Sequence, residues 1–188
     1  MFNEGKIIFL NGTSSSGKSC IAKELQKHLE EVFLHISVDT FLNLLPDHVL
    51  NGDEIEVIQK EILKVISGMH EILKTLAQNG NNLIVDHVLE LPSWLTECVE
   101  YLNNFYVFFV AVRCPLEELE KREEKRDRQK GLARSQFNRI YKPNIYDYEI
   151  DTSKYEAHEC AKKIINAYKV CKEPEAFKKL YNMREFHL

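Results

Sequence analysis

Short runs of apolar residues alternate along the chain with longer segments whose apolar residues recur at helical spacing. We interpret three of the short runs as buried strands that end at polar or turn residues. A fourth run is almost wholly apolar, as a central parallel strand covered on both faces should be. The expected strands are 6–10, 34–38, 83–85 and 105–112, and a last short one at 146–151.

The segments between these runs have the periodicity of amphipathic helices, with apolar residues three and four positions apart. The pattern that begins at Ile55 predicts either one long helix or two stacked helices with a break near Ser67 and Gly68. Proline is well tolerated in the first turn of a helix, which agrees with a start at Pro115. Helices are expected from Lys18, over 55–76, over 92–103, from Pro115 and over 157–168.

The alternation of strands and helices predicts an α/β fold with a parallel sheet and right-handed crossovers. The length of 188 residues fits a single domain with a sizeable core, and no internal repeat or linker divides it. Within this domain, 1–188, we expect a cap region at about 40–66 and a lid at about 121–141. The charged tail, 171–188, is expected to pack loosely.

Composition and charge exclude several classes of protein. The net charge of −4 argues against non-specific nucleic-acid binding, which needs a broad basic surface. The five cysteines are scattered and form no C-x-x-C pair, so free thiols in a reducing cytosol fit better than disulfides or a zinc cluster. The apolar run Ile7–Leu10 is too short for a signal peptide or a membrane span. We therefore expect a soluble, cytoplasmic protein with no nucleic-acid or membrane partner.

A glycine- and serine-rich loop follows the first strand, and it matches G-x-x-x-x-G-K-[ST] at every defined position. Glycines let successive backbone N–H groups turn toward phosphate oxygens at the positive end of the next helix. The Lys18 ammonium would reach the β- and γ-phosphates, and the Ser19 hydroxyl suits Mg²⁺. The expected nucleotide-binding residues are Gly12, Thr13, Ser14, Ser15, Ser16, Gly17, Lys18, Ser19 and Cys20.

Two aspartates follow expected strands, at the edge where ligands of open parallel sheets bind. Asp86 is the predicted partner of Ser19 at the magnesium ion. Asp39 should face the γ-phosphate, where a carboxylate can accept the proton of an attacking hydroxyl. The alternative for each aspartate is a helix N-cap. His87 either lines the same site, packs in the core or caps a helix.

A basic segment, 121–139, contains five arginines and three lysines interleaved with glutamates. A solvated helix with i, i+4 ion pairs explains much of this pattern. Phosphoryl transfer, however, needs cations over the transferring group, and a closing lid would supply them. Arg126 and Arg128 are the predicted lid arginines, and Arg122 lies one turn before Arg126. An RNA-binding arm is disfavoured because no aromatic residues alternate with the arginines.

Together these residues resemble the chloramphenicol phosphotransferase-like family of P-loop kinases, from Ile7 to about Tyr168. The resemblance implies a P-loop NTPase fold with a five-stranded parallel sheet of order 2-3-1-4-5 and helices on both faces. It also implies phosphorylation of a primary hydroxyl, with Asp39 as the catalytic aspartate and lid arginines at Arg126 and Arg128. The motifs that carry it are IIFLNGTSSSGKS, ISVD, LIVDHV, VAVRCP, the order Arg122, Arg126, Asp127-Arg128, Gly131, Gln136, and then YDYEIDTS and HECA.

We therefore expect an O-phosphotransferase that uses ATP and Mg²⁺ and acts on a hydroxyl of a small molecule, either chloramphenicol-like or another neutral acceptor. No guanine-reading N-K-x-D follows a strand, which favours adenine. The sequence leaves open whether the chain forms a homo-oligomer.

Two alternatives remain. A kinase of nucleosides, nucleotides or nucleotide sugars is the alternative among enzymes. A monophosphate acceptor would need a second basic pocket, and the segment 42–59 contains no lysine or arginine. A nucleotide-binding switch without transfer chemistry is the alternative from another class, and for it Asp39 would be dispensable.

Overall fold

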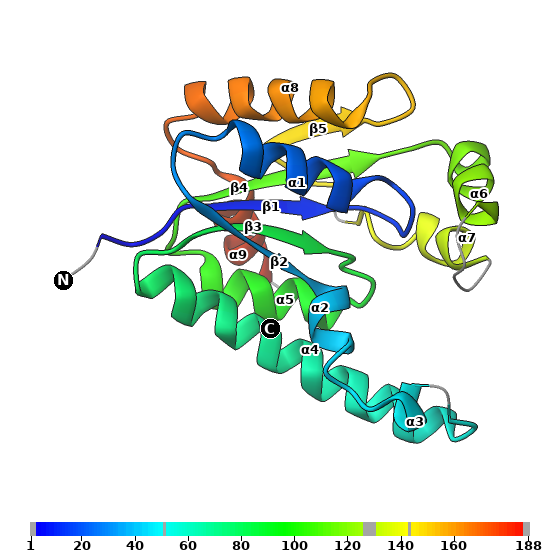
Figure 1. Cartoon of the computed structure of the whole chain (residues 1–188). Coiled ribbons are helices and arrows are strands. Elements are labelled where there is room, and N and C mark those ends of the chain that lie inside the picture. The colour runs from blue at the N-terminus through cyan, green and yellow to red at the C-terminus, as the bar shows by residue number, and fades with distance from the viewer. Residues whose placement is uncertain (1–2, 51, 126–130, 143, 186–188) are drawn as a thin grey trace.

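The computed structural model describes residues 3–50, 52–125, 131–142 and 144–185. In this part of the chain, five parallel strands form one sheet in the order β2-β3-β1-β4-β5, which confirms the expected order (Figure 1). The strands are β1 (Ile7–Asn11), β2 (Phe33–Ser37), β3 (Asn82–His87), β4 (Val107–Arg113) and β5 (Tyr148–Asp151).

The five expected helices are all present. The segment from Ile55 forms one continuous helix through Ser67 and Gly68. A Cβ atom built at Gly68 would meet no other atom of the described residues within 4 Å outside its own stretch of helix. These helices are α1 (Lys18–His28), α4 (Ile55–Gln78), α5 (Pro92–Leu102), α6 (Leu116–Glu124) and α8 (Ala157–Val170). Four further helices among the described residues were not expected: α2 (Val38–Leu42), α3 (Asp47–Leu50), α7 (Leu132–Phe137) and α9 (Ala176–Glu185).

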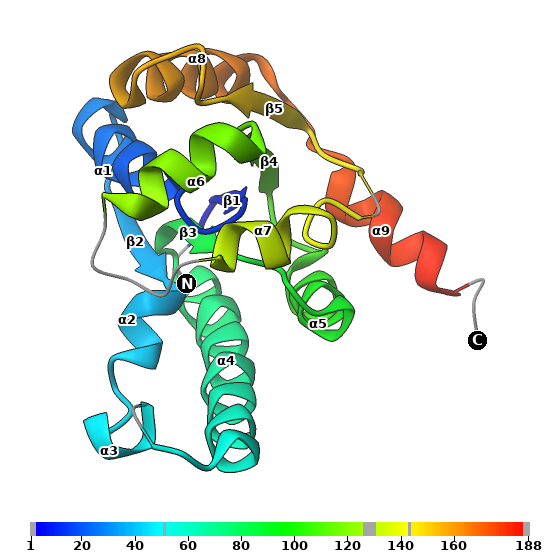
Figure 2. The same cartoon turned by 90° about the vertical axis from the view of Figure 1, so that its right-hand side faces the viewer.

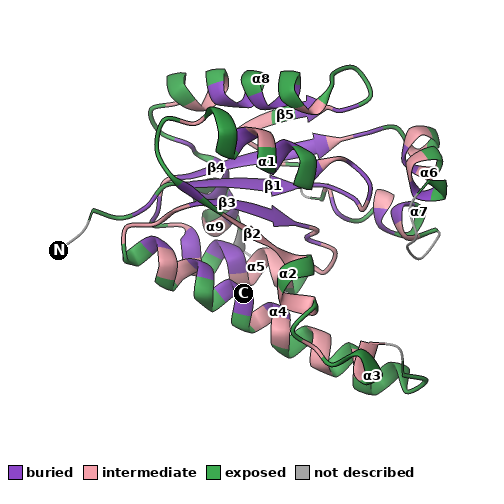
Figure 3. Ribbon diagram, viewed as in Figure 1, coloured by how far each residue is buried: buried purple, intermediate pink, exposed green. Residues whose placement is uncertain are grey.

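Helices cover both faces of the sheet, and the strands bury side chains on both. Alternate residues of each strand point to opposite faces. Ile8 and Leu10 of β1 pack under α1 and α8, whereas Ile7 and Phe9 pack under α4, α5 and α9. Figure 3 shows the central strands as the most continuously buried part of the fold. This double burial explains why the strands are apolar runs rather than alternating ones.

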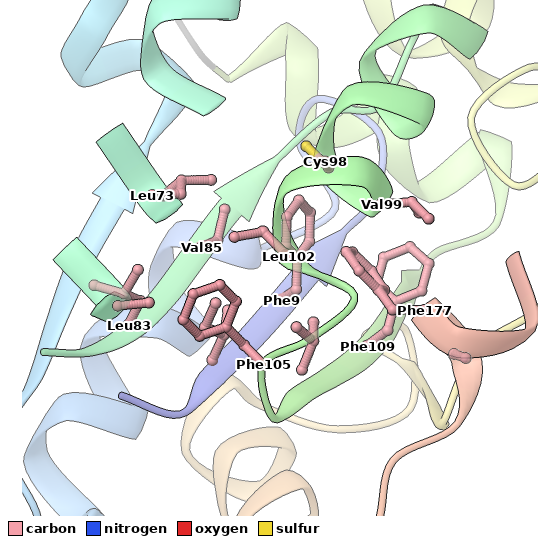
Figure 4. Close-up of a cluster of buried hydrophobic side chains, with 14 of the residues drawn as sticks. Phe9, Leu73, Leu83, Val85, Cys98, Val99, Leu102, Phe105, Phe109 and Phe177 are labelled. Carbon is pink, nitrogen blue, oxygen red and sulfur yellow. The ribbon is translucent and has the colours of Figure 1, made fainter. Parts of the chain in front are cut away.

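The tail was wrongly expected to pack loosely. Its helix α9 lies against β4 and α5, and the Phe177 ring enters the core beside Phe9 and Phe109 (Figure 4). Only 2% of Phe177 is exposed. Asp147 fixes the start of this helix, because one carboxylate oxygen accepts N–H bonds from Glu175 and Ala176 and the other accepts one from β4. The tail is therefore part of the domain core.

We expect Phe177→Ala to lower the free energy of unfolding by about 3–5 kcal/mol, because it leaves a cavity among aromatic rings. Met183→Ala is the matched control: it shortens an apolar side chain of the same helix that is 47% exposed, and it should change stability by less than about 0.5 kcal/mol. Urea unfolding curves measure both. Equal effects of the two substitutions would show that α9 does not contribute to the core in solution.

The carboxyl ends of the strands meet at one edge of the sheet, which faces the viewer in Figure 2. Helices α6 and α7 cross this edge, and α2, α3 and the start of α4 extend beyond it on one side (Figures 1 and 2). The lid and the acceptor cap are expected in these two regions, and their roles remain predictions. Among the described residues, no helix combines the length and apolar character needed to cross a membrane.

Candidate active site

The glycine- and serine-rich loop begins where β1 ends and closes on the first residues of α1. Gly12 passes so close to β4 that a Cβ atom there would lie 2.5 Å from the Val112 carbonyl oxygen. Gly17 caps α1 with a φ of +92°, in the left-handed region that favours glycine. Both glycines of the motif are therefore required by the backbone path, and the loop curls around the N-terminus of α1.

The interior of this loop fits a phosphate group. The Lys18 ammonium lies inside the loop and donates hydrogen bonds of 2.8 Å to the carbonyl oxygens of Gly12 and Thr13. The Ser16 hydroxyl oxygen is buried and has no hydrogen-bond partner among the described residues. An unpaired buried hydroxyl and a cation at a helix N-terminus are features of an anion site.

Asp86 meets the loop at the end of β3. Its carboxylate accepts a hydrogen bond of 2.6 Å from the Ser19 hydroxyl and lies 3.9 Å from the Lys18 ammonium. Burial raises the pKa of Asp86, but the His35 ring, the Lys18 charge and the Ser19 hydroxyl outweigh burial, so the pKa lies below its usual value. The carboxylate is thus ionised at neutral pH. With the Ser19 hydroxyl it forms a pair of hard oxygen donors that fits Mg²⁺.

Asp39 reaches the same site from the neighbouring strand. Ser37, the last residue of β2, is the register partner of Asp86. The Ser37 hydroxyl accepts a hydrogen bond from the Thr40 N–H and so caps α2. The strand therefore ends at Ser37, one residue before the expected position. Asp39 lies in the first turn of α2 and lines one cleft together with Lys18, Ser19 and Asp86. The structure thus brings these four predicted residues together, and their roles remain predictions.

The cleft as a whole has a volume of about 340 Å³, and part of its walls is apolar. The sequence reasoning did not identify the residues of these walls, because they come from separate helices and loops and form no local motif. Periodicity alone could indicate only that such side chains are apolar and half-buried. The wall residues are Val38, Leu42, Ile62, Val88, Trp94 and Leu132.

Gln136 of α7 connects the loop to the far wall of the cleft. Its side-chain oxygen accepts the backbone N–H of Ser14 at 2.8 Å, and its amide nitrogen donates to Glu90 at 3.1 Å. Glu90 also pairs with Arg139. Gln136 appeared in the sequence reasoning only within the family motif, and Glu90 did not appear. Together they hold α7 against the phosphate-binding loop.

A second hollow opens on the other side of the loop, between α1, α6 and the start of α8. Cys20 is exposed and lines this hollow, and its role in nucleotide binding remains a prediction. Arg122 lines the same hollow, and its guanidinium donates to the hydroxyl and the carbonyl oxygen of Thr152. The Thr152 hydroxyl in turn donates to the Ser16 carbonyl oxygen. Arg122 thus supports the outer wall of the phosphate loop through Thr152.

The two predicted lid arginines, Arg126 and Arg128, lie outside the described residues. The helices on either side are joined by Glu123 of α6, whose carboxylate accepts the N–H groups of Gly131 and Ala133. This contact ties the end of α6 to the start of α7.

His87 lies in the core, as one of its alternatives stated. It follows Asp86 directly, but alternation along β3 turns its side chain to the opposite face of the sheet, under α4 and α5. It is fully buried and stacks on Phe9. His87 therefore does not contribute to the phosphate side of the cleft.

Comparisons with known proteins agree with this geometry. The model of the chloramphenicol phosphotransferase-like protein family matches residues 5–169. A Mycobacterium tuberculosis protein that is provisionally named an O-phosphotransferase is 30% identical over 198 residues, which cover 94% of this chain and 88% of that protein.

Solved structures share the fold at lower identity. An unliganded sugar kinase from Janibacter has a TM-score of 0.69 and 16% identity, and covers 88% of this chain and 95% of its own. The Mycobacterium tuberculosis APS kinase, solved with AMPPNP and APS, has a TM-score of 0.65 and 16% identity, over 89% of this chain and 99% of its own. With the sheet order and the loop geometry, these likenesses establish the P-loop NTPase fold.

Proposed function

The chain belongs to the chloramphenicol phosphotransferase-like family, and on that premise we propose that it transfers the γ-phosphoryl group of ATP to a hydroxyl of a small molecule. One observation carries the proposal. Asp39 lines the same cleft as Lys18, Ser19 and Asp86. A nucleotide switch needs the loop and a metal-binding pair, but it has no need for a further carboxylate facing the γ-phosphate.

In this proposal, the loop holds the β- and γ-phosphates through its backbone N–H groups and the Lys18 ammonium. Ser19 and Asp86 would hold Mg²⁺, which neutralises charge on the phosphate oxygens when it is bound. We place the nucleoside in the second hollow, which Cys20 lines.

Asp39 would act on the acceptor. Its carboxylate accepts the hydroxyl proton while the acceptor oxygen forms a bond to the γ-phosphorus, and the bond from that phosphorus to the bridging oxygen of ADP breaks. The products are ADP and an organic phosphate ester. Because the charge of the γ-phosphoryl group spreads over its oxygens during transfer, cations above it add stabilisation. Arg126 and Arg128 are proposed for that role.

The cleft walls support an acceptor with an uncharged, apolar body. Besides its polar and charged residues, which include Glu90 and Gln136, the cleft is lined by aliphatic side chains and the Trp94 ring. Such walls bind by burying apolar surface, and a few polar groups then orient the ligand. Chloramphenicol-like acceptors fit this description, and so do other apolar alcohols.

A panel experiment tests the proposal. Purified protein is incubated with Mg²⁺ and ATP and with one hydroxyl compound at a time, including chloramphenicol, sugars and nucleosides, and ADP formation is followed. The expected result is that one acceptor class stimulates ADP formation above the acceptor-free rate. Stimulation by a nucleoside would favour the alternative kinase. If ATP binds and no compound on the panel stimulates its consumption, the switch hypothesis is favoured.

We expect Asp86→Asn to raise the Mg²⁺ concentration required for half-maximal ATP consumption by about tenfold or more, as removal of a metal-orienting carboxylate generally does. Asp151→Asn is the matched control, since Asp151 also ends a strand of the sheet but bonds to Ser153. A titration of activity with Mg²⁺ at fixed ATP measures the effect. An unchanged Mg²⁺ requirement in Asp86→Asn would remove Asp86 from the metal site.

A further inference from the structure

Three potential metal ligands meet in the core, on the face of the sheet opposite the phosphate-binding loop. His87 ends β3, His70 comes from the middle of α4, and Cys98 comes from α5; Figure 4 shows Cys98 in the core. None of the three is exposed to solvent. The donor atoms of the three side chains all lie within 4.8 Å of one another. Such a group is unusual in a core otherwise built from aliphatic and aromatic side chains.

A carboxylate orients one of the two imidazoles. Nδ1 of His70 lies 2.7 Å from a carboxylate oxygen of Glu97, which fixes the proton of His70 on that nitrogen. Nε2 of His70 then presents a lone pair, and it faces Nε2 of His87 at 2.9 Å. A carboxylate behind a histidine is the arrangement that orients histidine ligands in metal sites.

Hydrogen bonding within the pair does not satisfy all of these atoms. If His87 carries its proton on Nε2, it donates to His70, but its Nδ1 is then a buried acceptor without a partner. If His87 carries its proton on Nδ1, two lone pairs face each other. A cation bound by both Nε2 atoms removes that repulsion.

We propose that His70, His87 and Cys98 bind one transition-metal ion of the zinc class, with Glu97 orienting His70. Zinc takes imidazole nitrogen at about 2.0–2.1 Å and thiolate sulfur at about 2.3 Å, in tetrahedral geometry. Three protein donors leave the fourth position to water. The Glu97 side chain, which bonds to His70, is 31% exposed.

The ion would join β3, α4 and α5 behind the cleft. The Trp94 ring packs on His87 with its centroid at 5.8 Å, and Trp94 also lines the cleft. A metal at this position would therefore fix the wall of the proposed acceptor site. The scattered cysteines and irregular histidine spacing gave no sign of it in the sequence, because the ligands come together only when β3, α4 and α5 pack. The proposal does not depend on the proposed function, and either can fail alone.

Cobalt is the probe for this site, because Co²⁺ replaces zinc and absorbs light when it is bound by a thiolate. Tag-free, metal-free protein is titrated with Co²⁺ in the presence of excess Mg²⁺. The expected result is one Co²⁺ per chain, with tetrahedral visible bands and a thiolate charge-transfer band in the near ultraviolet. The protein as purified should contain zinc, and a chelator should lower its thermal unfolding midpoint.

Three variants assign the site. Cys98→Ala should lose the charge-transfer band, whereas Cys160→Ala should keep it, since Cys160 is equally buried but lies on the opposite face of the sheet. Asp86→Asn should also keep the band, which separates this site from the magnesium pair. The proposal is overturned if no stoichiometric Co²⁺ binds to the wild type, or if Cys98→Ala binds it with an unchanged spectrum. In the first case the cluster is a hydrogen-bonded pair of histidines only.

Discussion

Replacing Asp39 with asparagine is expected to reduce acceptor-dependent phosphoryl transfer by about 10²- to 10⁴-fold while ATP still binds. The substitution keeps the size of the side chain and removes the carboxylate that would accept the hydroxyl proton. Asp39 lies in the first turn of α2 with an exposed side chain, so the protein should fold normally. The defect should therefore appear in kcat rather than in the affinity for nucleotide.

The control for this variant is Asp47→Asn. Asp47 begins α3, is equally exposed and does not line the cleft. ATP affinity by calorimetry and transfer rate with a stimulating acceptor are measured for both variants. Transfer by Asp39→Asn at the wild-type rate would remove Asp39 from the chemistry, and the switch hypothesis would then be the better account.

Replacing Lys18 with alanine is expected to weaken ATP binding by about 100-fold or more, because charge-assisted hydrogen bonds to phosphate oxygens are lost. The Lys18 ammonium lies inside the loop, bonded to two of its carbonyl oxygens and close to Asp86. Its removal leaves the loop without its cation and Asp86 without a neighbouring positive charge. Transfer should therefore fall together with binding, in contrast to Asp39→Asn.

Lys23→Ala serves as its control, since Lys23 is an exposed lysine of the same helix. Binding of a fluorescent ATP analogue measures both affinities, and circular dichroism checks that each variant is folded. An unchanged affinity in Lys18→Ala would mean that the loop does not hold the nucleotide phosphates.

The strand, loop and helix that form the predicted phosphate site could be derived from local sequence because they are local. A strand, a loop and a helix follow one another, and both glycines are set by the path of the backbone. Asp39 and Asp86 were predictable for a different reason: parallel strands end at one edge, so acids that follow neighbouring strands must lie close together. In the sheet order, β2 lies beside β3, and Ser37 at the end of β2 is the register partner of Asp86.

Features that depend on tertiary packing were not predictable. The apolar residues of the tail are interspersed with charged ones, and Ala176, Phe177 and Leu180 are all turned toward the core. Their spacing of one and four positions was the available signal, and the surrounding charges obscured it. Glu90 and Gln136 meet only because α7 crosses the edge of the sheet. The positions of these residues follow from the packing of distant elements rather than from the local sequence pattern.

The central claim is most directly tested by following the γ-phosphoryl group itself. ATP labelled at the γ-phosphate is incubated with the protein, Mg²⁺ and the acceptor that stimulates ADP formation, with Asp39→Asn in parallel. The account expects the label in an organic phosphate ester of that acceptor, formed by the wild type and not by the variant. Label released only as inorganic phosphate, at one rate with and without acceptor, would contradict it.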